Sequence, residues 1–267
     1  MSDAPPKKIT VPQLVAMKQA HHKITVVTAY DYTMARLVDA AEIECILVGD
    51  SVGMVVQGRP NTLPVTLDQM IYHAEMVGRA VHHALTVVDL PFPSFLLGVS
   101  RTIENAARVL KETGCQAVKL EGGAERAEVI AALVSAGIPV MAHCGLRPQA
   151  ICQLGGYRVQ RDHDRLMADA KAAEQAGAFS IVLECVPAPL AAEVTAALQI
   201  PTIGIGAGAG CDGQVLVLHD LLGLTLDRSP RHVKRYAQLK ETVVQAVGQF
   251  RDEVREGKFP TDEQAFH

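Results

Sequence analysis

Ionisable side chains stand at the ends of six short apolar segments of the sequence. They are Asp31, Asp50, Asp89, the pair Lys119 and Glu121, His143 and Glu184. A buried charge is costly unless it is paired or binds a metal, so buried segments rarely end this way without a reason. If the fold brings the six ends together, these side chains form one reactive site.

Several of these residues also have an ordinary structural explanation when each is considered alone. Asp50 fits a solvated turn or a helix cap, and Asp89 fits a turn closed by an Asx hydrogen bond. His143 fits a core histidine, and Lys119 with Glu121 fits an ion pair on one side of a strand. Convergence of all six ends at one place favours a functional site over these separate explanations.

Glu184 is the hardest of these residues to explain by packing alone. It stands between Leu183 and Cys185 in an apolar setting, and we expect burial to raise the pKa of its carboxyl. A carboxyl with a raised pKa suits a general base.

Asp50 and Asp89 would supply a pair of hard oxygen ligands. Mg²⁺ usually takes one or two carboxylates and keeps water or substrate oxygens, and Glu121 is a third candidate ligand, direct or through water. The His and Cys spacings do not suggest zinc. Mg²⁺ can chelate a 2-oxo acid and stabilise its enolate, with Lys119 adding positive charge. The residues therefore predict metal-assisted proton abstraction next to a carbonyl.

The elements that must position these residues alternate along the chain. Eight short runs rich in Val, Ile and Leu are separated mostly by helical patterns, as in parallel strands buried on both faces. Eight such repeats in 267 residues indicate a (β/α)8 TIM barrel, whose active sites lie at the carboxyl ends of the strands. An open doubly wound sheet is the alternative.

Helices are also predicted before and after the repeats. An extra N-terminal helix covers about residues 11–20, and a long final helix begins with Ser229 as N-cap and Pro230 in its first turn. We expect residues 1–267 to form a single barrel domain with a short irregular C-terminal tail after Gly257.

Two connections have unusual sequences. Gly208, Gly210 and Gly213 match G-x-G-x-x-G, but they follow the seventh run and lead into another strand, so the dinucleotide signal is weak. A tight turn with backbone close to a ligand is the better interpretation. The connection 146–164 is too long for a simple turn, and its core at Gly155, Gly156 and Tyr157 predicts a hinged lid.

Composition excludes several classes of protein. The net charge is −4 without a basic run, so we expect no nucleic-acid partner and no electrostatic attachment to a membrane. No apolar stretch approaches the roughly 20 residues of a membrane helix. The N-terminal sequence lacks a signal-peptide pattern, which predicts a cytoplasmic protein. The six scattered cysteines are expected to be reduced thiols.

A series of motifs resembles, in order over nearly the whole chain, those of the ketopantoate hydroxymethyltransferase family. They are "TAYDYTMARL", "LVGDSVGMVVQG", "TLPVTLDQMIYH", "DLPF", "VKLEGG", "HCGLRPQ", "GGYRVQ", "LECVP", "IGIGAG" with "DGQVLV", and the terminal "AFH". The resemblance implies a barrel of the phosphoenolpyruvate/pyruvate superfamily that uses Mg²⁺ and forms a homo-oligomer, commonly a decamer of two pentamers.

The resemblance also implies a reaction. A hydroxymethyl group passes from 5,10-methylenetetrahydrofolate to 3-methyl-2-oxobutanoate, which gives 2-dehydropantoate and tetrahydrofolate in pantothenate biosynthesis. The alternatives are a Mg²⁺-dependent lyase or mutase of the same superfamily that acts on another 2-oxo acid, and a barrel that binds an oxo acid without turning it over.

The family motifs assign roles to individual residues. The Asp of "GDS" and the Asp of "DLPF", here Asp50 and Asp89, bind the metal and through it the substrate, and Ser51 helps to hold the oxo acid. Lys119 and Glu121 correspond to a substrate contact and a metal ligand.

Two assignments concern proton transfer, and one segment departs from the pattern. Glu184 corresponds to the proton acceptor, and His143 could orient substrate or carry a proton. The family pattern continues with glycines after "GGY-x-VQ", whereas here Gln160 is followed by Arg161, Asp162 and His163 in a shorter connection. This difference affects the lid and not the metal or base positions.

Overall fold

The chain forms two compact units, which are Met1–Val217 and Leu218–His267. This computed structural model describes residues 7–226 and 230–266. All the described strands belong to the first unit, and the described part of the second unit is helical or irregular.

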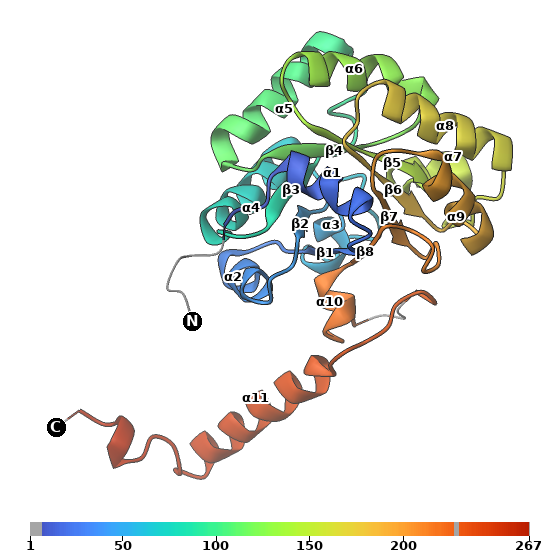
Figure 1. Cartoon of the computed structure of the whole chain (residues 1–267). Coiled ribbons are helices and arrows are strands. Elements are labelled where there is room, and N and C mark those ends of the chain that lie inside the picture. Colours follow the sequence, from blue (N-terminus) through green and yellow to red (C-terminus); the bar gives the residue numbers. More distant parts are fainter. Residues whose placement is uncertain (1–6, 227–229, 267) are drawn as a thin grey trace. The chain divides into compact units, whose positions relative to one another are not determined.

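The first unit is a closed barrel of eight parallel strands in sequence order, with β8 paired to β1 (Figure 1). This confirms the predicted (β/α)8 fold. The strands are β1 (Ile24–Thr28), β2 (Cys45–Val48), β3 (Leu85–Asp89), β4 (Ala117–Glu121), β5 (Val140–Gly145), β6 (Ser180–Glu184), β7 (Thr202–Ile205) and β8 (Gly213–Leu216).

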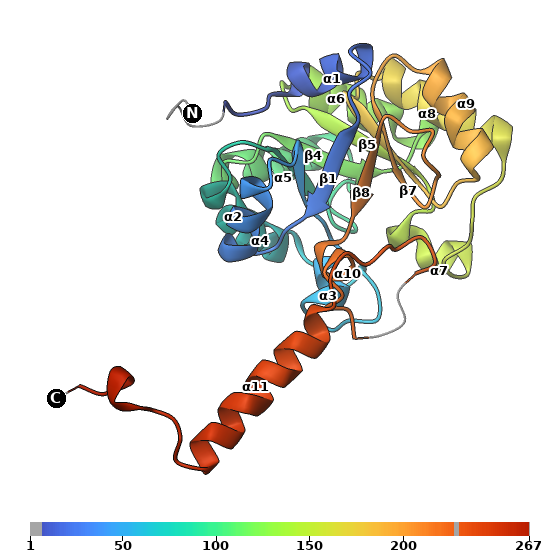
Figure 2. The same ribbon diagram turned by 60° about the horizontal axis from the view of Figure 1, so that its bottom comes forward.

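Helices surround the barrel and close one of its ends. They are α1 (Val11–Gln19), α2 (Tyr32–Ala40), α3 (Val52–Val55), α4 (Leu67–Ala80), α5 (Val99–Thr113), η1 (Ala124–Arg126), α6 (Ala127–Ser135), η2 (Pro148–Ala150), α7 (Ile151–Leu154), α8 (His163–Gln175) and α9 (Ala188–Ala197). The predicted extra N-terminal helix is thus present. Figure 2 shows α1 at the amino ends of the strands, with α3 and α7 at the opposite ends.

Helix α4 shows how the local sequence produces these outer elements. Thr66 accepts a hydrogen bond from the Gln69 backbone N–H, and the Gln69 side chain accepts one from the Thr66 N–H, which is a capping box. Met70, Ala74 and Val77 then recur at helical spacing and are fully buried. The cap sets where the helix begins, and the apolar stripe sets which face packs on the barrel.

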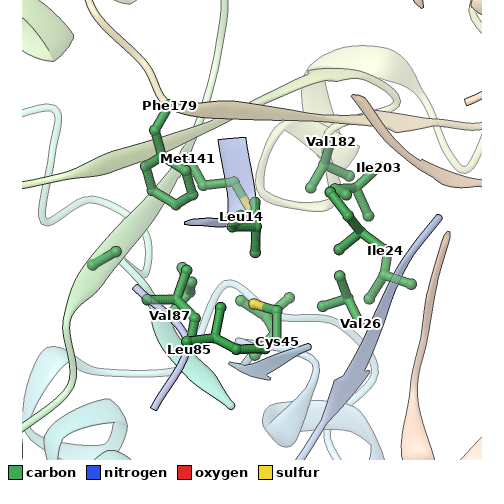
Figure 3. Packing of buried hydrophobic residues seen from close by; sticks show 14 residues of the cluster. Leu14, Ile24, Val26, Cys45, Leu85, Val87, Met141, Phe179, Val182 and Ile203 are labelled. Carbon is green, nitrogen blue, oxygen red and sulfur yellow. The ribbon is translucent and has the colours of Figure 1, made fainter. Parts of the chain in front are cut away.

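The interior of the barrel is filled by side chains at alternating strand positions, and α1 covers it. Figure 3 shows Leu14 of α1 at the centre of a ring of buried residues that come from the strands. The ring includes Ile24, Val26, Cys45, Leu85, Val87, Met141, Val182 and Ile203. This apolar layer belongs to the half of the barrel nearest the strand starts, so it provides stability and no chemistry.

The glycine-rich connection between β7 and β8 contains no described helix. Gly208 has a φ of +79°, and a Cβ atom there would lie 2.4 Å from the Cβ of Ala188 in α9. A Cβ on Gly210 would lie 2.9 Å from the Cβ of Ala192 in the same helix. Close packing against α9 therefore accounts for Gly208 and Gly210, and the predicted approach of this turn to a ligand stays a prediction.

The second unit contains α10 (Leu218–Leu221), α11 (Leu239–Arg255) and η3 (Asp262–Gln264). The predicted start of the long final helix is wrong, because α11 begins at Leu239; Ser229 lies outside the described residues. The N–H of Tyr236 donates to the carbonyl of Leu221, and that of Leu239 donates to Leu222. These hydrogen bonds use backbone groups that a longer helix would need for itself.

Two further expectations concern the whole chain. None of the helices in the described part of the chain is long and apolar enough to cross a membrane. All six cysteines are free thiols, as predicted, and four of them are buried.

Replacement of Leu14 by Ala should destabilise the barrel strongly. Leu14 is fully buried, and removing a large aliphatic side chain from such a position costs about 2–5 kcal/mol. Urea unfolding at a fixed protein concentration measures this difference. The matched control is Leu37→Ala on α2, where the side chain is 63% exposed and we expect a change within about 0.5 kcal/mol. Equal losses in the two variants would contradict the assignment of Leu14 to the core.

Candidate active site

The inward-facing strand positions change from apolar to ionisable toward the carboxyl ends. In β3 the series is Leu85, Val87 and Asp89, and in β4 the residues after Ala117 on the same face are Lys119 and Glu121. In the same way His143 follows Met141 in β5, and Glu184 follows Val182 in β6. The period-two alternation of the strands thus places a polar layer directly on the apolar core.

A continuous series of contacts runs across β3, β4, β5 and β6. Lys119 Nζ lies 2.8 Å from Asp89 Oδ1 in an ion pair whose side chains are 6% and 4% exposed. Lys119 Nζ also lies 3.1 Å from Nδ1 of His143. His143 Nε2 lies 3.2 Å from Glu184 Oε2, although without the angle of a good hydrogen bond. One lysine and one histidine therefore connect two carboxylates across four neighbouring strands.

The contact with Lys119 assigns the proton on His143. An ammonium group can only donate, so Nδ1 of His143 accepts and the ring proton of the neutral imidazole is on Nε2. Burial and the charge of Lys119 hold the pKa of His143 well below its usual value, so the ring is neutral. Burial alone would lower the pKa of Lys119, but Asp89 and the other nearby carboxylates outweigh it and raise that pKa. The histidine thus presents an N–H to Glu184.

The backbone around Glu184 is held on both sides. The carbonyl of Glu184 accepts from the N–H of Leu146 at 2.8 Å, and a Cβ on Gly145 would lie 2.3 Å from that carbonyl oxygen. The next residue, Cys185, has a φ of +50°, and its carbonyl accepts from the N–H of Gln160 at 2.9 Å. Glu184 is 16% exposed at its side chain, so a fixed backbone carries a carboxylate that still reaches solvent.

Asp50 and Asp89 meet at the ends of β2 and β3. The backbone N–H of Asp50 donates to Oδ2 of Asp89 at 3.1 Å, and both residues are buried. Oδ2 of Asp50 accepts a hydrogen bond from the side chain of Gln149 at 2.9 Å. Next to Asp50, the Ser51 hydroxyl lies 2.8 Å from the hydroxyl of Tyr30. The structure therefore brings the predicted ligand pair together.

The mouth of the barrel is formed by the side chains at the carboxyl ends of β2 to β6, which are Asp50, Asp89, Lys119, Glu121, His143 and Glu184. It contains more negative than positive charge. Burial, and next the charge of Asp89, raise the pKa of Asp50 to about 7. Burial, and next the charge of Asp50, raise the pKa of Glu121 well above its usual value. Lys119 forms an ion pair with Asp89. A divalent cation would balance the remaining negative charge.

The donor set fits Mg²⁺ held by two carboxylates and not a complete protein cage. No group of three or more His, Cys, Asp or Glu side chains in residues 7–226 and 230–266 is arranged to hold a metal ion. Mg²⁺ typically uses one or two carboxylates and keeps water or substrate oxygens. Asp50 and Asp89 would be that pair, and their role as ligands, like that of Glu121, stays a prediction.

Other expectations about single residues are corrected. Asp31 does not join the mouth, because its side chain is exposed and accepts from the N–H of Met34, which makes it the N-cap of α2. Lys119 pairs with Asp89 of the neighbouring strand. The structural explanation drawn from the sequence had paired Lys119 with Glu121 instead. Asp89 accepts from Asp50 on another strand instead of closing an Asx turn of its own.

The connection after β5 contains the predicted lid segment. Gly155 and Gly156 have φ of +66° and +117°, and the hydroxyl of Tyr157 lies 3.5 Å from the sulfur of Met54 in α3. Burial, and next the charge of Glu184, raise the pKa of Tyr157. The departure from the family pattern falls at the start of α8, where Asp162 is the N-cap.

Two residues of the mouth were not predicted from the sequence as site residues. Gln149 contacts Asp50 through its side chain, and its backbone N–H donates to Glu121. Tyr30 is fully buried beside Ser51. Both residues lie in motifs shared with the family, Gln149 at the end of "HCGLRPQ" and Tyr30 in "TAYDYTMARL", but the sequence assigned neither of them a role.

A closed barrel with carboxylates, a lysine and a histidine at its mouth defines a (β/α)8-barrel enzyme. Residues 8–262 match the family model described as ketopantoate hydroxymethyltransferase. The chain therefore belongs to the ketopantoate hydroxymethyltransferase family and is a transferase.

Individual relatives support this assignment. The chain is 56% identical over 259 residues to a 3-methyl-2-oxobutanoate hydroxymethyltransferase of Rhodopirellula baltica, covering 97% of this chain and 96% of the relative. It is 53% identical over 264 residues to the protein with the same name from Pelobacter propionicus, covering 98% of each.

Solved structures of other enzymes share the fold. Phosphonopyruvate hydrolase in complex with oxalate and Mg²⁺ has a TM-score of 0.63 at 13% identity, covering 97% of this chain and 92% of the other. A 2,3-dimethylmalate lyase of the PEP mutase/isocitrate lyase superfamily has a TM-score of 0.61 at 17% identity, covering 96% and 91%. At these identities the likeness shows the fold alone.

Without a divalent cation, the protein should lose stability as the pH rises through the folded pKa of Asp50. This carboxyl titrates near 3.8 when unfolded and at about 7 when folded. The stabilising contribution of its proton is therefore complete below pH 4 and is lost as the pH rises through 7. Asp50→Asn removes this loss, so we expect a variant more stable than wild type at pH 8 by up to about 4 kcal/mol.

Urea unfolding in the presence of a chelator, at several pH values and one protein concentration, measures this effect. The difference between variant and wild type should shrink toward pH 4, where Asp50 is protonated in the folded state and partly protonated in the unfolded state, and it should shrink further below that pH. A difference that is the same at pH 4 and pH 8 would contradict the raised pKa.

Proposed function

We propose that the chain transfers a hydroxymethyl group from 5,10-methylenetetrahydrofolate to 3-methyl-2-oxobutanoate. The products would be 2-dehydropantoate and tetrahydrofolate, as one step in pantothenate biosynthesis. The names of relatives more than 50% identical over nearly the whole chain support the oxo-acid substrate. The folate co-substrate rests on the motif resemblance described above.

The single observation that carries the proposed chemistry is the series of contacts from Asp89 to Glu184. It connects the predicted metal side of the mouth with the predicted base through Lys119 and His143. A Mg²⁺ ion held by Asp50 and Asp89 would act as a Lewis acid toward the oxo acid. A fold neighbour solved in complex with oxalate and Mg²⁺ is consistent with this proposal.

Glu184 is the general base of the proposed reaction. It removes the proton from C3 of the oxo acid, the bond between the methylene carbon and N10 of the folate opens to give an N5 iminium, and the enolate carbon bonds to that methylene carbon. Water then breaks the remaining bond to N5. Its hydroxyl stays on the methylene carbon as the hydroxymethyl group, and its proton and the proton from C3 go to the two nitrogens of tetrahydrofolate. His143 Nε2 lies 3.2 Å from the carboxylate without hydrogen-bond alignment, and in the proposed reaction its N–H would turn toward the carboxylate and stabilise its ionised form before the proton transfer. Because the backbone of Glu184 is fixed by Leu146, the base is held in one position for this step.

Lys119 and Ser51 bind the substrate oxygens in this proposal. The ammonium group of Lys119 is buried and charged, so it stabilises negative charge that develops on the enolate oxygen. The hydroxyl of Ser51, oriented by Tyr30, donates to the substrate carboxylate. His143 positions Glu184 and Lys119, which is a narrower role than direct proton transfer to substrate.

A lyase or mutase of the same superfamily is the alternative, because such enzymes share the fold. It differs from the proposed transferase in needing no folate. An assay with and without tetrahydrofolate therefore separates the two reactions.

We also propose that the protein acts in the cytoplasm as a homo-oligomer, with a decamer of two pentamers as the state implied by the resemblance. The second unit supports self-association, because none of the residues in α11 is buried. Val243, Val247, Phe250 and Val254 recur at helical spacing there and are 47–62% exposed. A stripe of this kind is typical of an interaction surface.

Replacement of Glu184 by Gln should stop the reaction and leave substrate binding intact. The amide keeps the size of the side chain but cannot accept the C3 proton, so product formation should fall by about 10²–10⁴-fold. The assay contains 3-methyl-2-oxobutanoate, formaldehyde, tetrahydrofolate and Mg²⁺, and calorimetry measures binding of the oxo acid.

The control variant is Glu193→Gln on α9, a carboxylate that is 59% exposed and contacts His163. It should keep wild-type activity. Wild-type activity in Glu184→Gln would show that another group is the base, and product formation at the same rate without tetrahydrofolate would contradict the folate role.

Val247→Asp should weaken self-association, because it places a charge in the middle of the apolar stripe. Sedimentation velocity of the wild type should show an oligomer, and the variant should show smaller species at the same concentration. Glu253→Asp, on the same helix but outside the stripe, should leave the wild-type distribution unchanged. A monomeric wild type would contradict the proposal.

A further inference from the structure

Gln149 lies in η2, just after β5, and its side chain is 92% buried among the acidic residues of the mouth. Its Nε2 donates to Oδ2 of Asp50 at 2.9 Å and to the carbonyl oxygen of Leu90 at 3.1 Å. Its backbone N–H donates to Oε2 of Glu121 at 3.1 Å. One residue thus connects the ends of β2, β3 and β4.

Chemistry fixes which way the amide of Gln149 faces. The carbonyl of Leu90 can only accept a hydrogen bond, so the NH₂ group must be on that side. The amide oxygen Oε1 therefore points away from Leu90. It is buried and accepts no hydrogen bond from the described residues. A buried acceptor without a donor is unfavourable, and such groups usually have a partner in the functional state.

We infer that Gln149 is a positioning residue of the divalent-cation site. The side-chain Nε2–H of Gln149 fixes the carboxylate of Asp50. The side-chain Oε1 accepts a hydrogen bond from a water molecule that hydrates the bound cation. Water polarised by a cation is a strong donor, which suits a buried amide oxygen that has no other partner. This inference rests on the proposed function, because it requires a cation at Asp50 and Asp89.

The variant Gln149→Met tests the inference with a side chain of similar length. It removes both polar groups of the amide and keeps the backbone N–H that donates to Glu121. Gln116→Met is the matched control. Gln116 is a partly buried glutamine whose Oε1 accepts from the N–H of Thr86 at 2.8 Å, at the start of β3 and away from the mouth.

Isothermal titration of the metal-free protein with MgCl₂, without oxo acid, measures the affinity directly. Thermal unfolding with and without Mg²⁺ is the second readout. Removal of a residue that orients a metal ligand typically weakens metal binding 10–100-fold. We expect this loss in Gln149→Met, with a smaller rise of the melting temperature on addition of Mg²⁺. Gln116→Met should bind Mg²⁺ as the wild type does, even if its melting temperature is lower.

Two results would overturn the inference, and they have different meanings. Equal or tighter Mg²⁺ binding by Gln149→Met, with normal binding by the wild type, would overturn the role of Gln149 alone. Absence of Mg²⁺ binding by the wild type would overturn the metal part of the proposed function and the inference with it. If Gln149→Met does not fold, Gln149→Leu fills the same space, and the same two outcomes apply.

Discussion

The buried ion pair between Lys119 and Asp89 is the interaction on which the mouth of the barrel depends. Both side chains are almost completely buried, and an unpaired charge at either position would be strongly destabilising. The pair leaves Lys119 in contact with His143, and His143 in contact with Glu184. The buried ammonium group of Lys119 therefore sets the protonation of His143 and, through His143, the surroundings of Glu184.

The barrel makes this arrangement possible because its strands alternate with period two. The same faces that carry Leu85, Val87 and Met141 in the core carry Asp89 and His143 one or two steps later. Apolar layers below the mouth hold the polar layer rigidly and exclude water from beneath it. The excess of negative charge that results is unfavourable in the protein alone and favourable for a site that binds a cation, which is a common compromise between stability and function.

Much of the fold could be predicted from the sequence, and the reasons are local. Most strands are short runs rich in apolar residues, and in β3, β4 and β6 a carboxylate ends the run, so these rim residues follow from the strand pattern. The pairing of charges did not follow, because Lys119 meets Asp89 through the register of two neighbouring strands. Asp31 has the same local pattern as Asp50, yet it caps a helix.

The remaining differences come from tertiary contacts that leave no local signal. Gln149 reaches Asp50 across 99 residues of sequence, and the motif "HCGLRPQ" that contains it does not reveal this contact. Gly208 and Gly210 after β7 pack closely against α9, a contact that no local pattern in the sequence reveals. The final helix begins later than its pattern predicts because nearby carbonyls of Leu221 and Leu222 take up the backbone N–H groups.

The most direct test of the account is proton NMR of 3-methyl-2-oxobutanoate in D₂O with the wild-type enzyme and no folate. The C3 proton signal should disappear when Mg²⁺ is present and should persist when a chelator removes it. That result would establish metal-dependent proton abstraction at the barrel mouth. Exchange at equal rates with and without Mg²⁺, or no exchange even after tetrahydrofolate is added, would contradict the central claim.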